Sequence, residues 1–280
     1  MYGKPHALAP LERQAYDAMH QFAQKALVYL VESPLAASLD NAPNSSGTLI
    51  STRRGRIAVL TARHVLTDKA PGVEVTVGGS GDSNGVPNAL GREWLHPDPE
   101  IDVALVELAP AAAARLGSRA FAADIVAPTD DANVGADQAT VINGYPFAYR
   151  RKAVDHRAKI VTVVFTSISY LTIVAPDRDR QGRYMVTWGQ ALLAEPDEMI
   201  QPGVRPGDQF HVGEPHGISG GPLWRFTKLP KTEVWELSKM ARIIGIASTF
   251  IRQDGLETCP SVAVWGDWFR ATIAAIDGVG

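Results

Sequence analysis

The sequence is poor in cysteine, with Cys259 as the one thiol among its 280 residues. A single cysteine cannot form a disulfide within the chain, so the core and the hydrogen bonds must hold the fold together. Secreted proteases often rely on several disulfides, whereas reduced thiols are typical of the cytoplasm. We therefore expect a reducing, cytoplasmic compartment. Cys259 lies beside Pro260 with no base placed for it, which favours a structural role over a nucleophilic one.

Long apolar segments are missing as well. The first 24 residues carry charged side chains and no apolar stretch of the kind found in signal peptides. The longest uncharged run, residues 160–176, is short for a membrane span and is filled with Thr, Ser, Tyr and β-branched residues. This run predicts sheet, and the sequence predicts neither a leader nor a membrane segment.

An excess of charge is absent too. The formal net charge is −3 at pH 7 and the isoelectric point is near 6.2. Without a basic excess, nothing favours binding to nucleic acid or to an anionic membrane. No repeat of solenoid length and no low-complexity tract is visible. Hydrophobic residues make up 45% of the chain, which suffices for a sizeable core in one large domain or two small lobes.

Short strands separated by turns dominate what is present. Runs rich in β-branched and apolar residues predict strands at 26–31, 48–52, 57–61, 73–77, 94–96, 102–108, 139–142, 160–174, 183–188, 221–226, 241–249 and 261–264. Almost no helix is expected between them. The pattern therefore predicts two lobes, each a barrel or sandwich of about six strands.

Helical spacing occurs near the two ends of the chain, over residues 11–26 and 265–276. The alanine-rich segment 111–137 is expected to be a surface loop that contains the boundary between the lobes. The predicted domains are an N-terminal helical extension, a first β-barrel and a second β-barrel, at residues 1–26, 27–125 and 126–280.

A glycine-rich segment, residues 216–222, places Ser219 among three glycines. Glycine can take a positive φ and bring bare N–H groups close to a ligand. A serine presented there can act as a nucleophile, while its own N–H and that of Gly217 bind an oxyanion. The segment also fits a plain turn before a strand, so the catalytic interpretation requires a base and an acid elsewhere in the chain.

The base has to be one of seven histidines. Only His64 sits where a strand runs into a short Thr-Ala-Arg-His-Val turn. Asp102 opens an apolar strand, so its carboxylate can be shielded from water while it reaches back to an imidazole. Asp98 and Glu100 lie just before it and are alternatives for the acid. Asp102 is favoured because it alone opens the apolar strand.

Together these motifs resemble the trypsin-like (chymotrypsin-fold) serine peptidases. The three motifs, in the chain order His, Asp, Ser, are Thr61-Ala62-Arg63-His64-Val65, Asp102-Val103-Ala104-Leu105 and Gly217-Ile218-Ser219-Gly220-Gly221-Pro222. Residues 143–146 are similar to a Gly-Tyr-Pro turn in bacterial members, and residues 244–248 to the strand that lines the substrate channel. The resemblance covers about residues 25–270, although the segment 147–215 is not typical.

The resemblance implies an all-β fold of two six-stranded antiparallel β-barrels, here with an N-terminal and a C-terminal helix. It implies a serine endopeptidase in which His64 takes the proton of Ser219 and Asp102 orients His64. The N–H groups of Gly217 and Ser219 would bind the oxyanion. The expected partner is a protein or peptide substrate, with any regulation coming from a further protein. The alternatives are a silent protease-fold module that binds a protein in its cleft, and an esterase.

No cofactor is expected, and no metal. His211 and His216 could ligate a metal ion, but no third ligand has suitable spacing, so surface or cleft histidines are favoured.

The segment before the nucleophile lines, by resemblance, the pocket for the side chain that precedes the cut. The predicted pocket residues are Gly213, Glu214, His216, Ser248 and Phe250. Gly213 stands where trypsin-like enzymes carry the acid that binds Lys or Arg. We therefore expect small or medium uncharged side chains, with basic ones as the alternative through Glu214.

One position departs from the family pattern. Ile218 precedes the serine where most members carry Asp or Asn. In many secreted members that carboxylate pairs with a new N-terminal ammonium, and an ammonium buried beside Ile218 would be unpaired. We expect Ile218 to pack against apolar neighbours and the protein to need no N-terminal cleavage.

Overall fold

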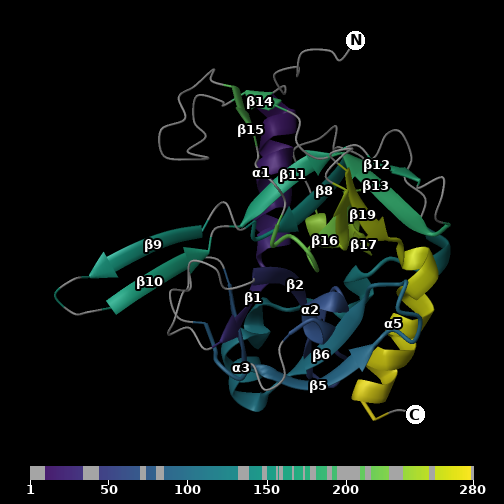
Figure 1. Cartoon of the computed structure of the whole chain (residues 1–280). Helices are drawn as coiled ribbons and strands as arrows, with labels where there is room; N and C mark the ends of the chain where they lie inside the picture. Colours follow the sequence, from purple (N-terminus) through teal and green to yellow (C-terminus); the bar gives the residue numbers. More distant parts are fainter. Residues whose placement is uncertain are drawn as a thin grey trace.

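β-Strand is the commonest regular structure in the described chain, and the strands are arranged in two lobes (Figure 1). The computed structural model describes residues 10–33, 44–69, 74–79, 85–131, 139–146, 150–155, 157, 160–165, 167–172, 174–176, 181–187, 191–193, 209–211, 216–226, 236–251 and 256–278. The predicted all-β class is confirmed.

The first lobe is a curled sheet with the strand order β4-β1-β2-β3-β6-β5 and a short β7 parallel to β2. Its strands are β1 (Leu27–Ser33), β2 (Asn44–Ser51), β3 (Ile57–Thr61), β4 (Glu74–Gly79), β5 (Leu90–Leu95), β6 (Ala104–Leu108) and β7 (Phe121–Ala122). Val77 and Val86 exchange two backbone hydrogen bonds, and Ala89 donates to the carbonyl of Val75. The segment that leads into β5 is thereby tied to β4, so the two edges of the sheet are linked.

The second lobe differs from the expected six-stranded barrel. It contains two four-stranded sheets, β11-β8-β16-β17 and β12-β13-β19-β18, which meet at a bridge between Gly245 and Ser261. The strands of these sheets are β8 (Ala139–Gly144), β11 (Ile168–Thr172), β12 (Val174–Pro176), β13 (Arg183–Thr187), β16 (Pro222–Phe226), β17 (Ala241–Ile246), β18 (Thr249–Ile251) and β19 (Leu256–Pro260).

The uncharged run 160–176 explains part of this difference. It is sheet, as predicted, but it is divided among β10 (Ile160–Phe165), β11 and β12, which belong to three different sheets. Strand β10 pairs with β9 (Arg150–Asp155) in a hairpin that extends away from the lobes in Figure 1. A second separate hairpin joins β14 (Ala191–Leu193) to β15 (Gln209–His211).

The terminal helices form as predicted, with one correction. Helix α1 spans Pro10–Gln24, and α5 spans Val262–Ile276. Residues 261–264, expected as a strand, are instead the start of α5, because the Ser261 hydroxyl caps the helix by accepting the N–H of Ala263. None of the described helices is both long and apolar enough to cross a membrane.

The alanine-rich segment after residue 110 is also a correction. It contains helix α3 (Pro110–Leu116) and then 3₁₀ turns at 117–119, 123–125 and 129–131, where a loop was expected. Alanine has the highest helix propensity, and proline is favoured in the first helical turn. Two further helices are short: α2 (His64–Thr67) begins soon after β3 ends, and α4 (Leu237–Met240) directly precedes β17.

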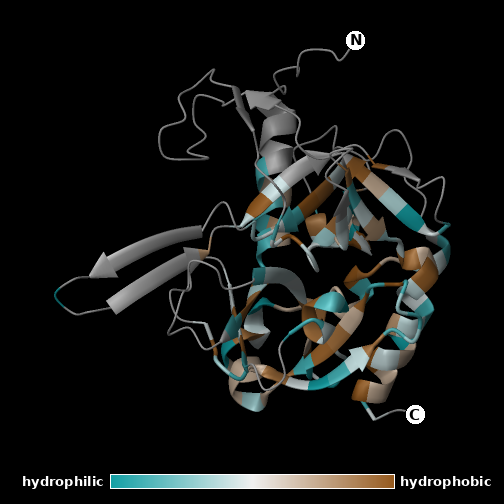
Figure 2. Cartoon of the chain, viewed as in Figure 1, coloured by the Kyte–Doolittle hydropathy of each residue, from teal (hydrophilic) through white to brown (hydrophobic). Residues whose placement is uncertain are grey.

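Buried hydrophobic residues from both lobes form the core. Many of the strands that carry them are brown, the colour of hydrophobic residues, in Figure 2. An aromatic group joins elements from distant parts of the sequence. Phe22 on α1 lies 4.7 Å from Phe121 on β7 and 5.9 Å from Trp224 on β16, measured between ring centroids. The N-terminal helix therefore shares its core with both lobes. The domain bounds at residues 26 and 125 stay a prediction.

The two lobes also meet at the turn around Gly220. Between the lobes, the Ser46 N–H donates to the Ser219 carbonyl at 2.8 Å. Within the second lobe, the Gly220 N–H donates to the Ala247 carbonyl at 2.8 Å. Gly220 has a φ of +85°, and a Cβ at this position would overlap the Ser46 carbonyl oxygen and the Thr61 hydroxyl. Glycine is required here for both its conformation and its size.

We expect Gly220→Ala to lower the free energy of unfolding by about 3 kcal/mol or more, because overlap adds to the strain of a positive φ. Gly55→Ala is the matched control: its φ is +77°, but a Cβ there meets open space. It should cost only about 1 kcal/mol. Urea denaturation of both variants measures the difference, and equal losses would show that contact across the lobes does not constrain Gly220.

Candidate active site

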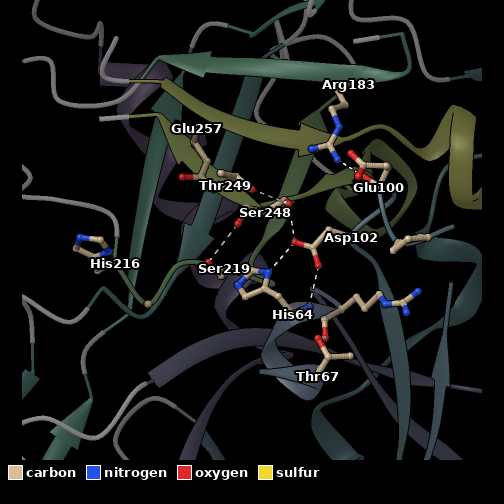
Figure 3. Close-up of a pocket in the computed structure, with 13 residues that line it drawn as sticks. His64, Thr67, Glu100, Asp102, Arg183, His216, Ser219, Ser248, Thr249 and Glu257 are labelled. Carbon is tan, nitrogen blue, oxygen red and sulfur yellow. Dashed lines mark hydrogen bonds and ion pairs between the residues drawn. The ribbon is translucent and has the colours of Figure 1, made fainter. Parts of the chain in front are cut away.

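His64 and Asp102 are joined by two hydrogen bonds between neighbouring parts of the first lobe. Asp102 Oδ1 accepts the backbone N–H of His64 at 2.8 Å, and Oδ2 lies 2.6 Å from His64 Nδ1 (Figure 3). The Ser248 hydroxyl, from the second lobe, donates to the same Oδ2 at 2.6 Å. With Nδ1–H held by the carboxylate, Nε2 is left as the basic nitrogen of the imidazole.

The electrostatics of this pair favour a charged imidazole beside a charged carboxylate. Burial alone would lower the pKa of His64, but the hydrogen bond and charge of Asp102, with the charge of Asp68, raise it overall. Burial alone would raise the pKa of Asp102, but hydrogen bonds from His64 and Ser248 and the charge of His64 lower it overall. An imidazole placed in this way can take up a proton at a smaller cost than a free one.

The alternative carboxylates do not contact His64. Asp98 Oδ1 accepts the backbone N–H of Glu100 at 2.9 Å, which stabilises the turn before the strand. Glu100 is exposed at the edge of the cavity. Among the three carboxylates that the sequence left open, only Asp102 lies against the imidazole in the described structure.

Ser219 lies in a tight turn built by glycines of positive φ. Gly217 has a φ of +96°, and the Gly221 N–H closes the turn on the Ile218 carbonyl at 2.7 Å. In the described part of the chain, the N–H groups of Gly217 and Ser219 donate to no protein group. They are therefore free to bind a ligand oxygen.

The Ser219 hydroxyl itself donates to the carbonyl of Ser248 at 3.4 Å. No hydrogen bond joins it to His64 in the described structure, although both side chains line one cavity. Catalytic hydrogen bonds are often long or misaligned before substrate binds, so this geometry describes a resting site.

Ser46 positions the turn, and no motif in the sequence indicates this role. Its hydroxyl donates to the Gly217 carbonyl at 2.8 Å and accepts the N–H of Tyr145 at 2.9 Å. Tyr145 belongs to the Gly-Tyr-Pro stretch, and its own carbonyl accepts a hydrogen bond from the Asn44 side chain at 2.6 Å. Strand β2 of the first lobe thus holds the serine turn of the second lobe.

A cavity of about 660 Å³ opens between the lobes. Residues from both lobes line it, including all three predicted catalytic residues: Arg63, His64, Thr67, Pro99, Glu100, Asp102, Arg183, His216, Gly217, Ser219, Ser248, Thr249 and Glu257. Sequence reasoning missed Arg183 and Glu257, because charged residues on separate strands carry no local motif.

The predicted substrate pocket is recovered in part. His216 and Ser248 line the cavity. Phe250 lies in β18, but its side chain is outside the described residues, as are Gly213 and Glu214. Among the described residues, no group of three or more His, Cys, Asp or Glu side chains is arranged to hold a metal ion.

Two buried residues agree with the sequence-based expectations. Ile218 is fully buried in the hydrophobic core and packs against Gly144, so the site offers no carboxylate at that position. Cys259 is fully buried, and burial raises the pKa of its thiol well above the usual value. A buried neutral thiol is a poor nucleophile, which supports the structural role.

No family model matches the chain, and no curated protein matches it. Solved structures that are similar include three serine proteases. The thermostable protease AL20 from an extremophilic microorganism is 12% identical, with a TM-score of 0.48, over 89% of this chain and 98% of that one. The VesB protease of Vibrio cholerae is 16% identical, with a TM-score of 0.46, over 87% and 62%. A Glu endopeptidase is 13% identical, with a TM-score of 0.49, over 90% and 91%.

We expect the imidazole of His64 to titrate above 6.5, and Asp102→Asn to bring its pKa below that value, because burial then dominates. Nuclear magnetic resonance of the histidine ring protons measures both. Asp98→Asn is the control and should leave the titration unchanged, since Asp98 contacts Glu100. A shift in the Asp98 variant but not in the Asp102 variant would mean that the acid is wrongly assigned.

Proposed function

We propose that the protein is a serine endopeptidase that cleaves peptide bonds through an acyl-enzyme. One observation supports this best: Asp102 holds His64 by two hydrogen bonds, in a cavity that also contains Ser219 and two unoccupied N–H groups. Nucleophile, base, orienting acid and oxyanion donors are the four parts that acyl transfer requires.

Reaction begins when the Ser219 hydroxyl turns from the Ser248 carbonyl toward Nε2 of His64. His64 takes the proton as the serine oxygen attacks the substrate carbonyl carbon, and the carbonyl oxygen becomes an oxyanion. His64 then gives this proton to the departing amine, which leaves an ester on Ser219. Water, deprotonated by the same imidazole, attacks the ester, and the proton returns to the serine as the acid product leaves.

The N–H groups of Gly217 and Ser219 would stabilise the oxyanion. Each such donor is worth roughly 3–4 kcal/mol in the transition state when its direction is fixed beforehand. Hydrogen bonds to the two carbonyls of this turn, from the hydroxyl and the N–H of Ser46, fix it here. Asp102 contributes by keeping the imidazole in one tautomer and by stabilising its charged form.

A second function is favoured by one observation. The Ser219 hydroxyl contacts the Ser248 carbonyl and not His64, as in a site that binds a protein without cutting it. A module of that kind has no need of the Asp102–His64 pair, which is intact here. We therefore rank the binding module second, and an esterase with the same serine chemistry below it.

We expect a fluorophosphonate to modify Ser219 and no other serine, because Ser219 alone, among the serines that the structure describes, has a base and oxyanion donors beside it. Peptide mapping by mass spectrometry identifies the adduct. Ser238→Ala removes an exposed serine and should leave labelling unchanged. Folded protein that takes up no label at Ser219 would refute the peptidase proposal and favour the binding module.

We expect Ser219→Ala and His64→Ala each to lower kcat/KM by at least about 10³-fold, and the double variant to be little worse than either, because the residues act as a unit. Hydrolysis of a fluorogenic protein substrate measures all three. If the two losses multiplied in the double variant, the serine and the imidazole would be acting independently.

A further inference from the structure

Glu257 is a buried carboxyl in the wall of the active-site cavity, and the proposed mechanism does not use it. It lies on β19, is 2% exposed and lines the cavity (Figure 3). No Lys, Arg or His forms an ion pair with it in the described part of the chain. Buried carboxylates are almost always paired with a cation, so the missing partner requires an explanation.

Arg183 is a candidate partner that lines the same cavity, but it is engaged elsewhere. Its guanidinium donates to the backbone carbonyl of Glu100 across the cleft and to the Thr258 hydroxyl at 3.4 Å. Arg63 lines the cavity too, and its guanidinium donates to the His96 carbonyl at 2.5 Å. The remaining titratable groups that line the cavity are His64, Glu100, Asp102 and His216. Asp102 is an anion and repels an ionised Glu257.

Glu257 is also close to the reacting atoms. It lines the same cavity as Ser248, the residue whose carbonyl accepts the Ser219 hydroxyl at 3.4 Å. Figure 3 accordingly places Glu257 beside Ser248 and Thr249. Ser219 and Glu257 line one cavity, so a long side chain of a substrate residue with its carbonyl at Ser219 can extend toward this carboxyl.

We propose that Glu257 binds a cationic side chain, lysine or arginine, of the substrate residue whose carbonyl carbon Ser219 attacks. The inference rests on the proposed peptidase function and names its substrate class. It selects the basic alternative over the uncharged side chains expected from Gly213, and it assigns recognition to Glu257 on β19 in place of Glu214.

The other side-chain classes fit less well. An acidic side chain would face both Glu257 and Asp102. An apolar side chain would seal the Glu257 carboxyl away from water and leave its polar atoms without enough partners. A lysine or arginine supplies both the missing charge and hydrogen-bond donors, and such charge-assisted bonds are strongest where water is excluded.

Proton release follows from this arrangement. Burial raises the pKa of Glu257 to about 8, against the hydrogen bond from Ser248 that lowers it, and Asp102 raises it further. At about pH 7 only about a tenth of this carboxyl is ionised. An arriving cation favours the ionised form and displaces the proton. Cation affinity should therefore rise with pH up to about 8 and then level off.

Binding of benzamidine, a rigid aryl cation, tests the site without any catalysis, and benzamide is its neutral counterpart. Calorimetry in buffers of different ionisation enthalpy should show release of about one proton at about pH 7 and almost none at about pH 9.5. Glu257→Gln, an isosteric change, should weaken benzamidine at least tenfold and leave benzamide unchanged. In this variant, the pH dependence of benzamidine affinity should lose the transition centred near 8. The transition caused by titration of His64 should remain.

Two other carboxylate variants are matched controls. Glu74→Gln, on the exposed edge of β4, should change nothing. Glu100→Gln, at the edge of the same cavity, should weaken benzamidine far less than Glu257→Gln. Release of no proton by the unmodified protein, or equal affinity of the Glu257→Gln variant, would overturn the proposal. So would a loss confined to Glu100→Gln.

Peptide cleavage then separates the two proposals. Among peptides that differ only in the residue before the cut, kcat/KM should be at least tenfold higher for Lys or Arg than for the uncharged norleucine. Glu257→Gln should remove this preference while norleucine peptides are still cut. Cleavage without the preference would refute the role of Glu257 and leave the peptidase standing. Glu257-dependent benzamidine binding without any cleavage would support the cation site and refute the peptidase.

Discussion

The rest of the site depends on the hydrogen bonds that the Asp102 carboxylate accepts. Its two oxygens accept the backbone and ring N–H groups of His64, and the Ser248 hydroxyl reaches it from the second lobe. This one group therefore sets the tautomer of the base and joins the walls of the cavity. A half-buried charge is stable there because three hydrogen bonds replace the water it has lost.

The serine turn depends on a second contact between the lobes. Gly220 fits beside the Ser46 carbonyl only because it lacks a Cβ, and the N–H and hydroxyl of Ser46 hold the two carbonyls of the turn. These bonds direct backbone carbonyls toward the first lobe and leave the N–H groups of Gly217 and Ser219 unbonded. The hydrogen bonds from Ser46 therefore both fix the conformation of the turn and leave its N–H groups able to bind an anion.

The cavity thus contains two carboxyl groups in different electrostatic states. Asp102 is stabilised as an anion by its donors, whereas Glu257 is deprived of water and faces the charge of Asp102. Two like charges in one poorly hydrated space cannot both ionise without cost. A cationic substrate side chain would remove this conflict. It would compensate the charge of Glu257, while the charge of Asp102 is already compensated by its hydrogen-bond donors.

The sequence by itself determined the terminal helices and most strands, and it predicted the candidate residues His64, Asp102 and Ser219, because helical spacing, β-rich runs and short motifs are local properties. Three things were decided only by tertiary structure: the two hydrogen bonds from His64 to the predicted Asp102, the support from Ser46, and the burial of Glu257 in the same cavity as the serine. Strand pairing determined each of them by bringing together residues that are distant along the chain. The division of residues 160–176 among three sheets has the same cause, since a strand's partner is set by long-range pairing that its own sequence does not encode.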